Sequence, residues 1–431
     1  MRIGIDGYNL ALPNGTGVAT YGASLARILA DASHQIIGIF GLNAGKAPAI
    51  RETLFFEQFG NGVSYHHLRR LLAREIITAP ASATLHNIPL TDKVERRDFG
   101  PRWPAFNELW TRPLLFEAAV ARFNSMHVMT TVHMKNPPDI MHWTYPVPLR
   151  MAGSRNIYTL HDLVPLKLPH TTLDNKTRYH RLIARLLAEG DHILTVSEAS
   201  RRDILGIFSP DPDQISNAYQ ASPLPNNVAM ANPTNDQAMI ERVFGLPSRG
   251  YYLFFGASDP KKNIGRIVDA YLASGSERPL VVVSSRDWGM SGASGGLGKD
   301  GTVYGRKTDR PIVQLQYLPR DMLFRLIRSA RAVLFPSLYE GFGLPALEAI
   351  QLGTPVIGSN TASLPEVVGP GGLLVDPYDT NAITEAIRAI DRDDGLIEQL
   401  GAAGMVHAAQ FSSQAFLARL SEVYSKLGHK L

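Results

Sequence analysis

The feature that most constrains the fold is a repeated alternation along both halves of the chain. Short apolar runs rich in β-branched residues alternate with longer segments of helical periodicity. This alternation is typical of a parallel sheet covered by helices, because parallel strands are joined by helical crossovers. We therefore predict an α/β fold. The expected strands are 2–6, 35–40, 140–143, 156–160 and 192–196 in the first half and 251–255, 280–284, 312–315, 332–335 and 355–358 in the second.

Two sets of strands in a chain of 431 residues indicate two Rossmann-like domains, because domains typically hold roughly 100–200 residues. A stretch rich in Pro and Asn near the middle of the chain interrupts both periodicities. We expect a first domain over residues 1–215, a linker over 216–235 and a second domain over 236–411. We also expect a C-terminal helix, 412–431, to pack back on the first domain.

The composition excludes several classes of protein. The 43 Lys and Arg residues exceed the 39 Asp and Glu residues by only four, unlike the concentrated positive charge of a nucleic-acid binder. The absence of cysteine excludes disulfides, thiolate metal sites and a cysteine nucleophile. No apolar run approaches the roughly 20 residues that span a bilayer, and the N-terminus lacks the pattern of a secretion signal. We therefore expect a cytoplasmic protein that does not bind nucleic acid.

The most informative segment is PSLYEGFGLPALEA, in which Glu340 and Glu348 stand in a Glu-x7-Glu spacing. Gly341, Gly343 and Pro345 argue against one continuous helix across this interval. We therefore expect Glu340 in the loop after a strand and Glu348 one turn inside the next helix, with Pro345 at the first helical position. Both carboxylates then lie beyond the carboxyl ends of parallel strands, where ligands of open α/β sheets bind.

This segment suits a ligand that carries both phosphate and hydroxyl groups. Glycines let the backbone approach a ligand, and N–H groups at a helix start favour an anion such as a diphosphate. Carboxylates instead accept the hydrogens of sugar hydroxyls. In GASDPKKNI, Lys262 follows a strand and a glycine turn, where it provides a counter-charge for phosphate. The alternatives are two solvated glutamates in a turn and an ordinary surface lysine.

The first half of the chain offers two weaker signals. Gly15 and Gly17 follow the first expected strand and precede a helix, as in half of a phosphate-binding turn. A glycine pair without the full G-x-G-x-x-G pattern is also compatible with a purely structural turn. His161 follows the expected strand 156–160, at the carboxyl end where ligands bind. The alternative for His161 is a structural histidine.

Together these motifs resemble glycosyltransferase family 4, which consists of retaining enzymes with the two-domain GT-B fold. The similar segments are the Gly15–Gly17 turn, YTLHDLVPL, VSEASRRDI, FFGASDPKKNI, the Glu-x7-Glu segment and SNTASLPEVVG. They cover nearly the whole second half and scattered parts of the first. HDLVPL and SLPEVVG resemble the mannosyltransferase-like members. The resemblance implies two Rossmann-like domains that face each other across a cleft.

The resemblance also implies roles for individual residues. Glu348 would bind the ribose hydroxyls of a nucleotide sugar, and Glu340 would hold hydroxyls of the transferred sugar. Lys262 would neutralise the leaving diphosphate, and His161 would lie beside the reacting sugar. His161, Lys262 and Glu340 are therefore the expected catalytic residues.

Further donor-binding residues follow from the same resemblance: Gly17, Ser258, Gly341, Phe342, Gly343 and Leu344. One position departs from the family pattern, because Ala257 stands where many relatives have an arginine after the loop glycine. We expect Lys261 or Arg286 to help Lys262 with the phosphates. The sequence has no Asp-x-Asp pair in a context that suggests a metal clamp, so we expect no metal and no other cofactor.

The expected function is retaining transfer of a hexose from a nucleotide-diphosphate sugar to a saccharide or lipid-linked saccharide, in bacterial surface polysaccharide synthesis. The mannosyltransferase-like segments favour GDP-mannose as the donor. One alternative is a sugar-nucleotide epimerase of the same architecture. A second alternative is a non-catalytic protein that binds sugar nucleotides or polysaccharide.

A peripheral contact with the inner face of the membrane is also expected. Its candidate parts are the amphipathic stretch 110–123 and five arginines, Arg178, Arg181, Arg185, Arg201 and Arg202. Basic and amphipathic segments can rest against an anionic lipid surface. The alternative is an ordinary charged helix face and a core helix.

Overall fold

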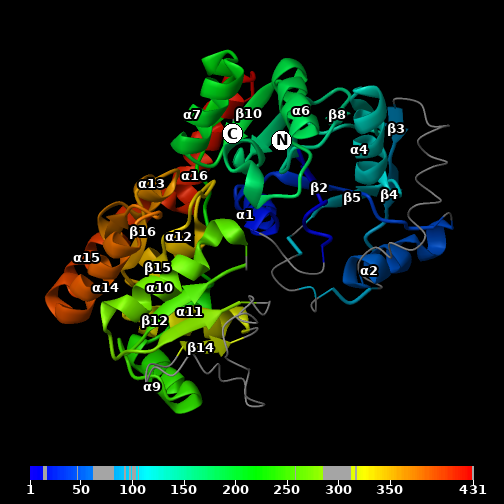
Figure 1. Cartoon of the computed structure of the whole chain (residues 1–431). Helices are drawn as coiled ribbons and strands as arrows, with labels where there is room; N and C mark the ends of the chain where they lie inside the picture. The colour runs from blue at the N-terminus through cyan, green and yellow to red at the C-terminus, as the bar shows by residue number, and fades with distance from the viewer. Residues whose placement is uncertain are drawn as a thin grey trace. The chain divides into compact units, whose positions relative to one another are not determined.

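The computed structural model describes residues 1–12, 17–45, 47–61, 82–91, 94–96, 99, 103–104, 106–257, 259–284, 312–315 and 318–429. The chain divides into two compact units. Unit 1 comprises Met1–Lys167, Leu173–Ala221 and Ser413–Leu431, and unit 2 comprises Leu168–Thr172 and Ser222–Ser412. In Figure 1 the colours therefore run from blue to green in unit 1, from green to orange in unit 2, and return to unit 1 in red.

Unit 1 is built on a large sheet, whose described strands follow the order β11-β10-β9-β7-β1-β2-β5-β4. Neighbouring strands are parallel except for the antiparallel pair β4 and β5. The strands are β1 (Arg2–Asp6), β2 (Gln35–Phe40), β4 (His86–Ile88), β5 (Glu108–Thr111), β7 (Ile140–Trp143), β9 (Arg155–Leu160), β10 (His192–Thr195) and β11 (Ile215–Asn217). A smaller parallel sheet has the order β3-β6-β8 and consists of β3 (Ser82–Thr84), β6 (Thr130–His133) and β8 (Leu149–Met151).

Helices cover the large sheet of unit 1 (Figure 1), and its central strands β1, β2, β7, β9 and β10 are largely buried. The helices are α1 (Gly17–Asp31), α2 (Arg51–Asn61), α4 (Leu115–Met126), α5 (Val164–Lys167), α6 (Lys176–Glu189), α7 (Glu198–Phe208) and α16 (Ser413–Lys426). Burial on both faces explains why the central strands read as continuous apolar runs rather than as alternating patterns. Ile39, Met141, Trp143 and Tyr158 belong to the core and are fully buried.

Unit 2 contains a parallel sheet in the order β14-β13-β12-β15-β16-β17. Its strands are β12 (Tyr252–Phe255), β13 (Leu280–Val283), β14 (Ile312–Leu315), β15 (Ala332–Phe335), β16 (Val356–Ser359) and β17 (Gly372–Val375). Its helices are α8 (Asn226–Ala229), α9 (Pro233–Phe244), α10 (Ile264–Ser274), α11 (Arg320–Ser329), α12 (Leu344–Gln351), α13 (Leu364–Val368), α14 (Thr380–Arg392) and α15 (Asp394–Ala408). The strand order reverses between β12 and β15, which makes the loops after these strands the natural ligand-binding position of unit 2.

The structure confirms the predicted α/β class with two mainly parallel sheets, and each expected strand is present within one residue at either end. The amphipathic stretch 110–123 is divided between a strand and a helix. Trp110 belongs to strand β5, and Leu114 has a left-handed conformation (φ 57°) that separates the strand from α4. The segment 216–235 also contains regular structure, namely α8 and the beginning of α9.

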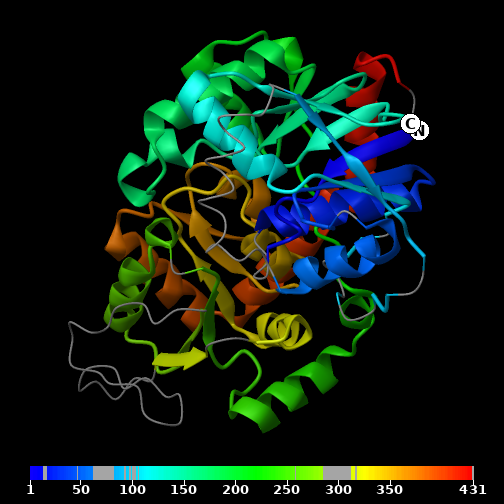
Figure 2. The same ribbon diagram turned by 90° about the vertical axis from the view of Figure 1, so that its right-hand side faces the viewer.

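The C-terminal helix α16 belongs to unit 1, where it lies beside α1 (Figure 2). The ring of Phe416 on α16 is 6.3 Å from the ring of Tyr21 on α1. The Tyr424 hydroxyl forms a hydrogen bond with Nε2 of His142 on β7. Residues far apart in the sequence thus share one core. None of the helices in the described part of the chain has the length and apolarity that a bilayer-spanning helix requires.

Candidate functional site

The candidate site in unit 2 begins with the loop that joins β15 to α12. The Ser363 hydroxyl donates hydrogen bonds to the carbonyl oxygens of Glu340 and Phe342, at 2.9 and 2.7 Å. The Leu338 N–H donates to the carbonyl oxygen of Lys261 at 2.7 Å. These bonds connect the loop to α13 on one side and to the lysine-bearing turn on the other. The conformation of the loop is therefore set by contacts with two other parts of unit 2.

Gly343 marks the end of this loop and the start of α12. Its φ of +103° is one that residues with a side chain rarely adopt. A Cβ atom at this position would lie only 2.7 Å from Cδ2 of Leu364. Leu344 is the first residue of α12, so Pro345 occupies the second helical position and not the first position that we expected. The glycine therefore allows the loop to pass close to α13 before the helix begins.

Glu340 and Lys262 form an ion pair at the centre of the site. Lys262 is the last residue of the 3₁₀ turn Pro260–Lys262, and its Nζ lies 2.6 Å from Oε1 of Glu340. The side chains are only 12% and 7% exposed, respectively. Burial alone would raise the pKa of Glu340, but Lys262, Lys261 and hydrogen bonds from Lys262 and Ser337 hold that pKa below its ordinary value. Glu340 is therefore an ionised, nearly buried carboxylate.

Asn263 holds the lysine-bearing turn against the glutamate loop. It has a left-handed conformation, with φ 62°, between the 3₁₀ turn and α10. Its Nδ2 donates to the carbonyl oxygens of Pro336 and Pro377, at 3.0 and 2.7 Å, and its Oδ1 accepts from Arg266 at 2.9 Å. The sequence analysis did not identify Asn263. Its position directly after two lysines in a strand-to-helix turn is the signal that could have indicated it.

Glu348, the fifth residue of α12, has a different cation as its partner. Nη2 of Arg320, the first residue of α11, donates to Oε1 of Glu348 at 2.8 Å. The Glu348 side chain is 10% exposed, whereas the Arg320 side chain is 44% exposed. Burial raises the pKa of Glu348, and Arg320 opposes this effect only in part. The sequence analysis missed Arg320, because nothing local in YLPRDML distinguishes it from an ordinary surface arginine.

In unit 1, His161 lies directly after β9 and is bonded to the backbone. Its Nε2 is 2.9 Å from the carbonyl oxygen of Thr144. Because a carbonyl oxygen only accepts, we assign the proton to Nε2. Burial lowers the pKa of His161 and favours the neutral ring. The ring of Tyr21 packs edge-on against it, at 5.0 Å between centroids.

Asp6, at the end of β1, supports the same region of unit 1. Its carboxylate accepts hydrogen bonds from the backbone N–H groups of Thr144 and Tyr8. Burial raises the pKa of Asp6 to about 6, although these hydrogen bonds lower it. Thr144 therefore connects the two residues, because its N–H donates to Asp6 and its carbonyl oxygen accepts from His161. The sequence analysis did not single out Asp6.

The remaining expected site residues are distributed as follows. Gly17 is the exposed first residue of α1 in unit 1. Ala257 is exposed in the loop after β12. Ser258 and Arg286 lie outside the described residues. The structure thus brings Lys262 to Glu340, gives Glu348 a partner of its own, and supports the 341–344 backbone between the two carboxylates.

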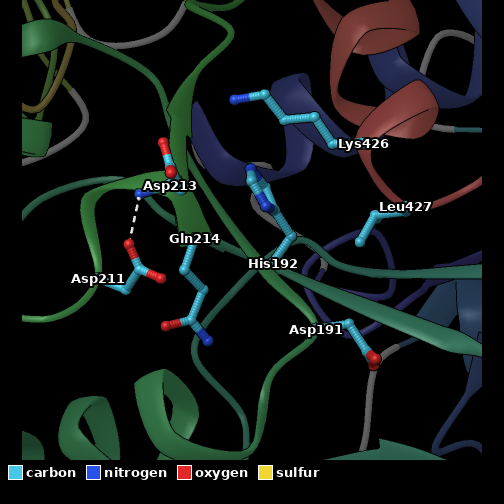
Figure 3. Close-up of a pocket in the computed structure, with 7 residues that line it drawn as sticks. All are labelled: Asp191, His192, Asp211, Asp213, Gln214, Lys426 and Leu427. Atoms are coloured by element: carbon cyan, nitrogen blue, oxygen red, sulfur yellow. Dashed lines mark hydrogen bonds between the residues drawn. The ribbon is translucent and has the colours of Figure 1, made fainter.

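Unit 1 also has a polar pocket of about 600 Å³ at the amino end of β10 (Figure 3). Its walls are formed by Asp191, His192, Asp211, Asp213, Gln214, Lys426 and Leu427. Several of these groups already have partners: Asp191 pairs with Arg155 at 3.2 Å, Asp211 accepts from the Asp213 N–H, and His192 bonds to Ser216. Ligands of parallel sheets bind at the opposite, carboxyl edge. We assign no function to this pocket.

The arginines considered for membrane contact fall into two groups. Arg178, Arg181 and Arg185 are exposed on α6, although Arg185 pairs with Glu189 at 2.6 Å. Arg201 instead donates to the carbonyl oxygens of Ile215 and Pro212 and is partly buried. Arg202 is exposed on α7. On α4, Leu115, Phe116, Ala119 and Phe123 belong to the core of unit 1, as the core-helix alternative predicted, whereas Val120 and Met126 are exposed.

Comparisons with known proteins give a consistent picture. Residues 306–406 match the family model described as glycosyl transferases group 1. Over 266 residues the chain is 34% identical to O-antigen chain mannosyltransferase B of Escherichia coli, which covers 60% of this chain and 67% of the relative. It is 26% identical over 283 residues to the serotype-specific mannosyltransferase WbdA of Escherichia coli, covering 63% of this chain but only 33% of WbdA. Sucrose-phosphate synthase from Thermosynechococcus elongatus has a similar fold, with a TM-score of 0.63, 18% identity and 99% coverage of both chains.

Proposed function

Because this chain belongs to the glycosyl transferases of group 1 and has the GT-B fold, we propose that it is a retaining family 4 enzyme that transfers mannose from GDP-mannose. The proposed acceptor is a saccharide or lipid-linked saccharide of a bacterial surface polysaccharide. The Lys262–Glu340 ion pair carries the proposal, because it places a cation and a hydroxyl acceptor 2.6 Å apart beyond β15. The mannosyltransferase names of two relatives support the choice of sugar.

The proposed chemistry assigns the diphosphate to Lys262. Transfer breaks the bond between the anomeric carbon and a diphosphate oxygen and forms a bond from that carbon to an acceptor oxygen. In same-face transfer, which we favour, the leaving phosphate oxygen takes the acceptor's proton. Negative charge builds on the diphosphate, so a preorganised cation lowers the barrier. Lys262 supplies this cation, with Lys261 and the backbone N–H groups at the start of α12 as helpers.

The two glutamates would recognise the sugars of the donor. Bound diphosphate offers Lys262 a second anionic partner, which frees Glu340 to accept hydrogen bonds from hydroxyls of the transferred sugar. Glu348 would accept those of the ribose. His161 remains a predicted contact of the reacting sugar. No metal ion is invoked in this scheme, and metal independence remains a prediction.

Thermal unfolding with nucleotides tests the proposal directly. The ligands are GDP, UDP, ADP and their common sugar conjugates, each with and without a chelator. A ligand at 100 times its dissociation constant adds about 2.7 kcal/mol of stability. We expect GDP and GDP-mannose to raise the unfolding temperature in chelator as well as without it. A Glu348→Gln variant should lose most of the shift, whereas Glu398→Gln, a control for an exposed glutamate on α15, should keep it.

Other outcomes would revise the proposal in defined ways. A shift with UDP alone would correct the donor base, and no shift with any nucleotide would contradict the proposed site. Transfer of radiolabelled mannose to a saccharide acceptor would then separate an enzyme from a binding protein. Formation of an epimer of the donor sugar without acceptor would instead support the epimerase.

We further propose that unit 1 contacts the inner face of the membrane through the exposed arginines of α6. Basic residues near an anionic surface contribute about 1 kcal/mol each. Replacing Arg178, Arg181 and Arg185 by Ala should therefore weaken binding to vesicles with anionic lipid by roughly 10²-fold. The control replaces Arg242 and Arg392, exposed arginines of unit 2. Equal binding of the two variants would contradict this contact.

A further inference from the structure

The Arg320–Glu348 ion pair joins the first residue of α11 to the middle of α12, and the two helices pack together. Arg320 is the first residue of α11 and follows Pro319, whose ψ of 142° is not helical. Glu348 lies on α12, which packs against α11. Their side chains meet at 2.8 Å between Nη2 and Oε1. The contact therefore depends on how α11 and α12 pack against each other.

The guanidinium of Arg320 is held by a second contact. Its Cζ lies 5.1 Å from the centroid of the Phe324 ring, one turn later on α11. Phe324 is 1% exposed, so the ring is a fixed part of the core. A guanidinium over an aromatic face has both a favoured position and a favoured plane. Arg320 thus presents its N–H groups to Glu348 from a defined direction.

The pair is asymmetric in a way that suits a ligand. The Glu348 carboxylate is nearly buried, whereas much of the guanidinium remains exposed. A carboxylate that is to accept two hydroxyl hydrogens must be ionised and held in one orientation. Burial raises the pKa of Glu348 and so works against ionisation, and the positive charge of Arg320 works against that effect. Lys262 also lies over an aromatic ring, with Nζ 4.7 Å from the centroid of Phe335, but an ammonium is a point charge and has no plane that the ring could fix.

We propose that Arg320 is a positioning residue for the donor nucleoside, because its guanidinium orients the Glu348 carboxylate toward the ribose hydroxyls. The inference rests on the proposed function, which assigns Glu348 to the ribose. It adds a residue outside the Glu-x7-Glu segment to the nucleoside site. It also predicts that Arg320 acts on ribose recognition and not on the binding of the phosphates.

The test compares a nucleotide with both ribose hydroxyls, a nucleotide without the 2′-hydroxyl, and pyrophosphate, which has no nucleoside. Dissociation constants for GDP, 2′-deoxy-GDP and inorganic pyrophosphate are measured by calorimetry for the full chain and its variants, with UDP and 2′-deoxy-UDP in parallel. The variants are Arg320→Met, Arg320→Lys, Glu348→Gln and the double variant Arg320→Met with Glu348→Gln. Arg392→Met, an exposed arginine on α14, is the control.

We expect Arg320→Met to weaken GDP binding about tenfold, typical for a lost hydrogen bond to a charged group. Pyrophosphate binding should change less than about twofold, and the preference for GDP over 2′-deoxy-GDP should decrease. The double variant should bind GDP no more weakly than Glu348→Gln alone, because both changes remove the same interaction. Arg320→Lys should recover part of the loss, and the control should bind like the wild type.

Three results would overturn the inference. These are unchanged GDP binding in Arg320→Met, equal weakening of GDP and pyrophosphate, and additive losses in the double variant. The proposed function fails separately if the wild-type protein binds neither GDP nor UDP. Wild-type binding combined with an unaffected Arg320→Met variant would reject only the role of Arg320.

Discussion

The two units treat the polar groups at the carboxyl ends of their strands in opposite ways. In unit 1, Asp6 and His161 bond to the backbone of Thr144, and burial shifts the pKa of each toward the uncharged form. In unit 2, Glu340 and Glu348 each meet a cationic side chain. In unit 1 backbone hydrogen bonds hold these groups in position, whereas in unit 2 ion pairs hold them.

The unit 2 pairs also differ from each other. At Glu340 the nearby lysines outweigh burial and lower the pKa of the carboxyl, whereas at Glu348 burial outweighs Arg320 and raises it. Buried ion pairs contribute little net stability, because desolvation offsets much of the attraction. In the proposed site these pairs would instead serve to recognise charged and hydroxyl groups of the donor. The contrast with unit 1 is that the ion pairs lie in the unit where we expect the phosphate ligand to bind.

Removing the cation from the unit 2 site should have the largest effect. We expect Lys262→Ala to lower turnover at saturating donor by roughly 10²–10³, as for other lost preorganised charges. The variant should also lose about 3–5 kcal/mol of unfolding free energy, because Glu340 is left buried without its ion-pair partner. Mannosyl transfer assays and urea unfolding measure the two effects.

A double variant separates these two effects of Lys262. Lys262→Met combined with Glu340→Gln replaces both charges by neutral groups of similar size. Stability should then return toward the wild-type value, while turnover stays low. Wild-type turnover in Lys262→Ala would exclude Lys262 as the counter-charge of the leaving diphosphate.

The buried histidine His142 of unit 1 should make the free energy of unfolding decrease at acid pH. Burial lowers the pKa of His142 to about 3, from an ordinary value of 6.5. Below pH 6.5 the unfolded chain binds a proton that the folded chain does not, so stability falls with falling pH, by about 1.4 kcal/mol per pH unit. His142→Gln should lose this contribution. Urea unfolding followed by tryptophan fluorescence measures the slope, because three of the four tryptophans, Trp103, Trp110 and Trp143, belong to unit 1.

Asp6 contributes to the same titration with the opposite sign. Its raised pKa gives stability that is present below its ordinary value of 3.8 and is lost as the pH rises through about 6. This contribution is common to the wild type and His142→Gln, so it cancels in the difference between their slopes. We expect the two slopes to differ by about 1.4 kcal/mol per pH unit between pH 4 and pH 6. Equal slopes would show that His142 is not held neutral in the folded protein.

A backbone change in unit 2 should have a somewhat smaller effect. Gly343→Ala places a Cβ at a φ of +103° and within 2.7 Å of Leu364. We expect a loss of about 1–3 kcal/mol of unfolding free energy, together with weaker nucleotide binding. Gly265→Ala is the matched control, because this helical position in α10 has open space around it and should become more stable by about 0.5–1 kcal/mol. Similar behaviour of both variants in urea unfolding would contradict the strain at Gly343.

The smallest expected effect is that of a chelator. If the lysine and the helix start supply all the positive charge that the diphosphate needs, turnover in excess chelator should equal turnover without it. Steady-state rates before and after exhaustive chelation measure this. A loss of activity that added Mg²⁺ or Mn²⁺ restores would show that unit 2 needs a cation beyond Lys262.

Sequence patterns predicted the parts of the fold that rest on long apolar runs. The expected strand 332–335 coincides with β15. A strand that is buried on both faces forms a continuous apolar run, which is easy to recognise in the sequence. The three-residue strands β3 and β8 were missed, since such short segments carry no periodicity. The stretch 110–123 has helical spacing, but Pro113 and the left-handed Leu114 separate strand from helix.

The candidate site was predictable only where its residues share one segment. Glu340 and Glu348 lie in a single strand-to-helix connection, which is why their loop and helix positions could be derived from glycine and proline placement. Arg320 lies 28 residues before Glu348, and its role depends on how two helices pack. Asn263 acts through backbone carbonyls of distant loops. Partners of this kind are defined by tertiary contacts and leave no local pattern.

The return of α16 to unit 1 has a consequence for how the protein is made. Tyr424 is synthesised 282 residues after its partner His142. At about 5–20 residues per second, a ribosome needs roughly 15–60 s to produce that length. The main segment of unit 2 is continuous and can fold within this interval, whereas unit 1 waits for its last helix. The unit that leaves the ribosome first is therefore completed last, and the α1 surface that α16 contacts stays uncovered until then.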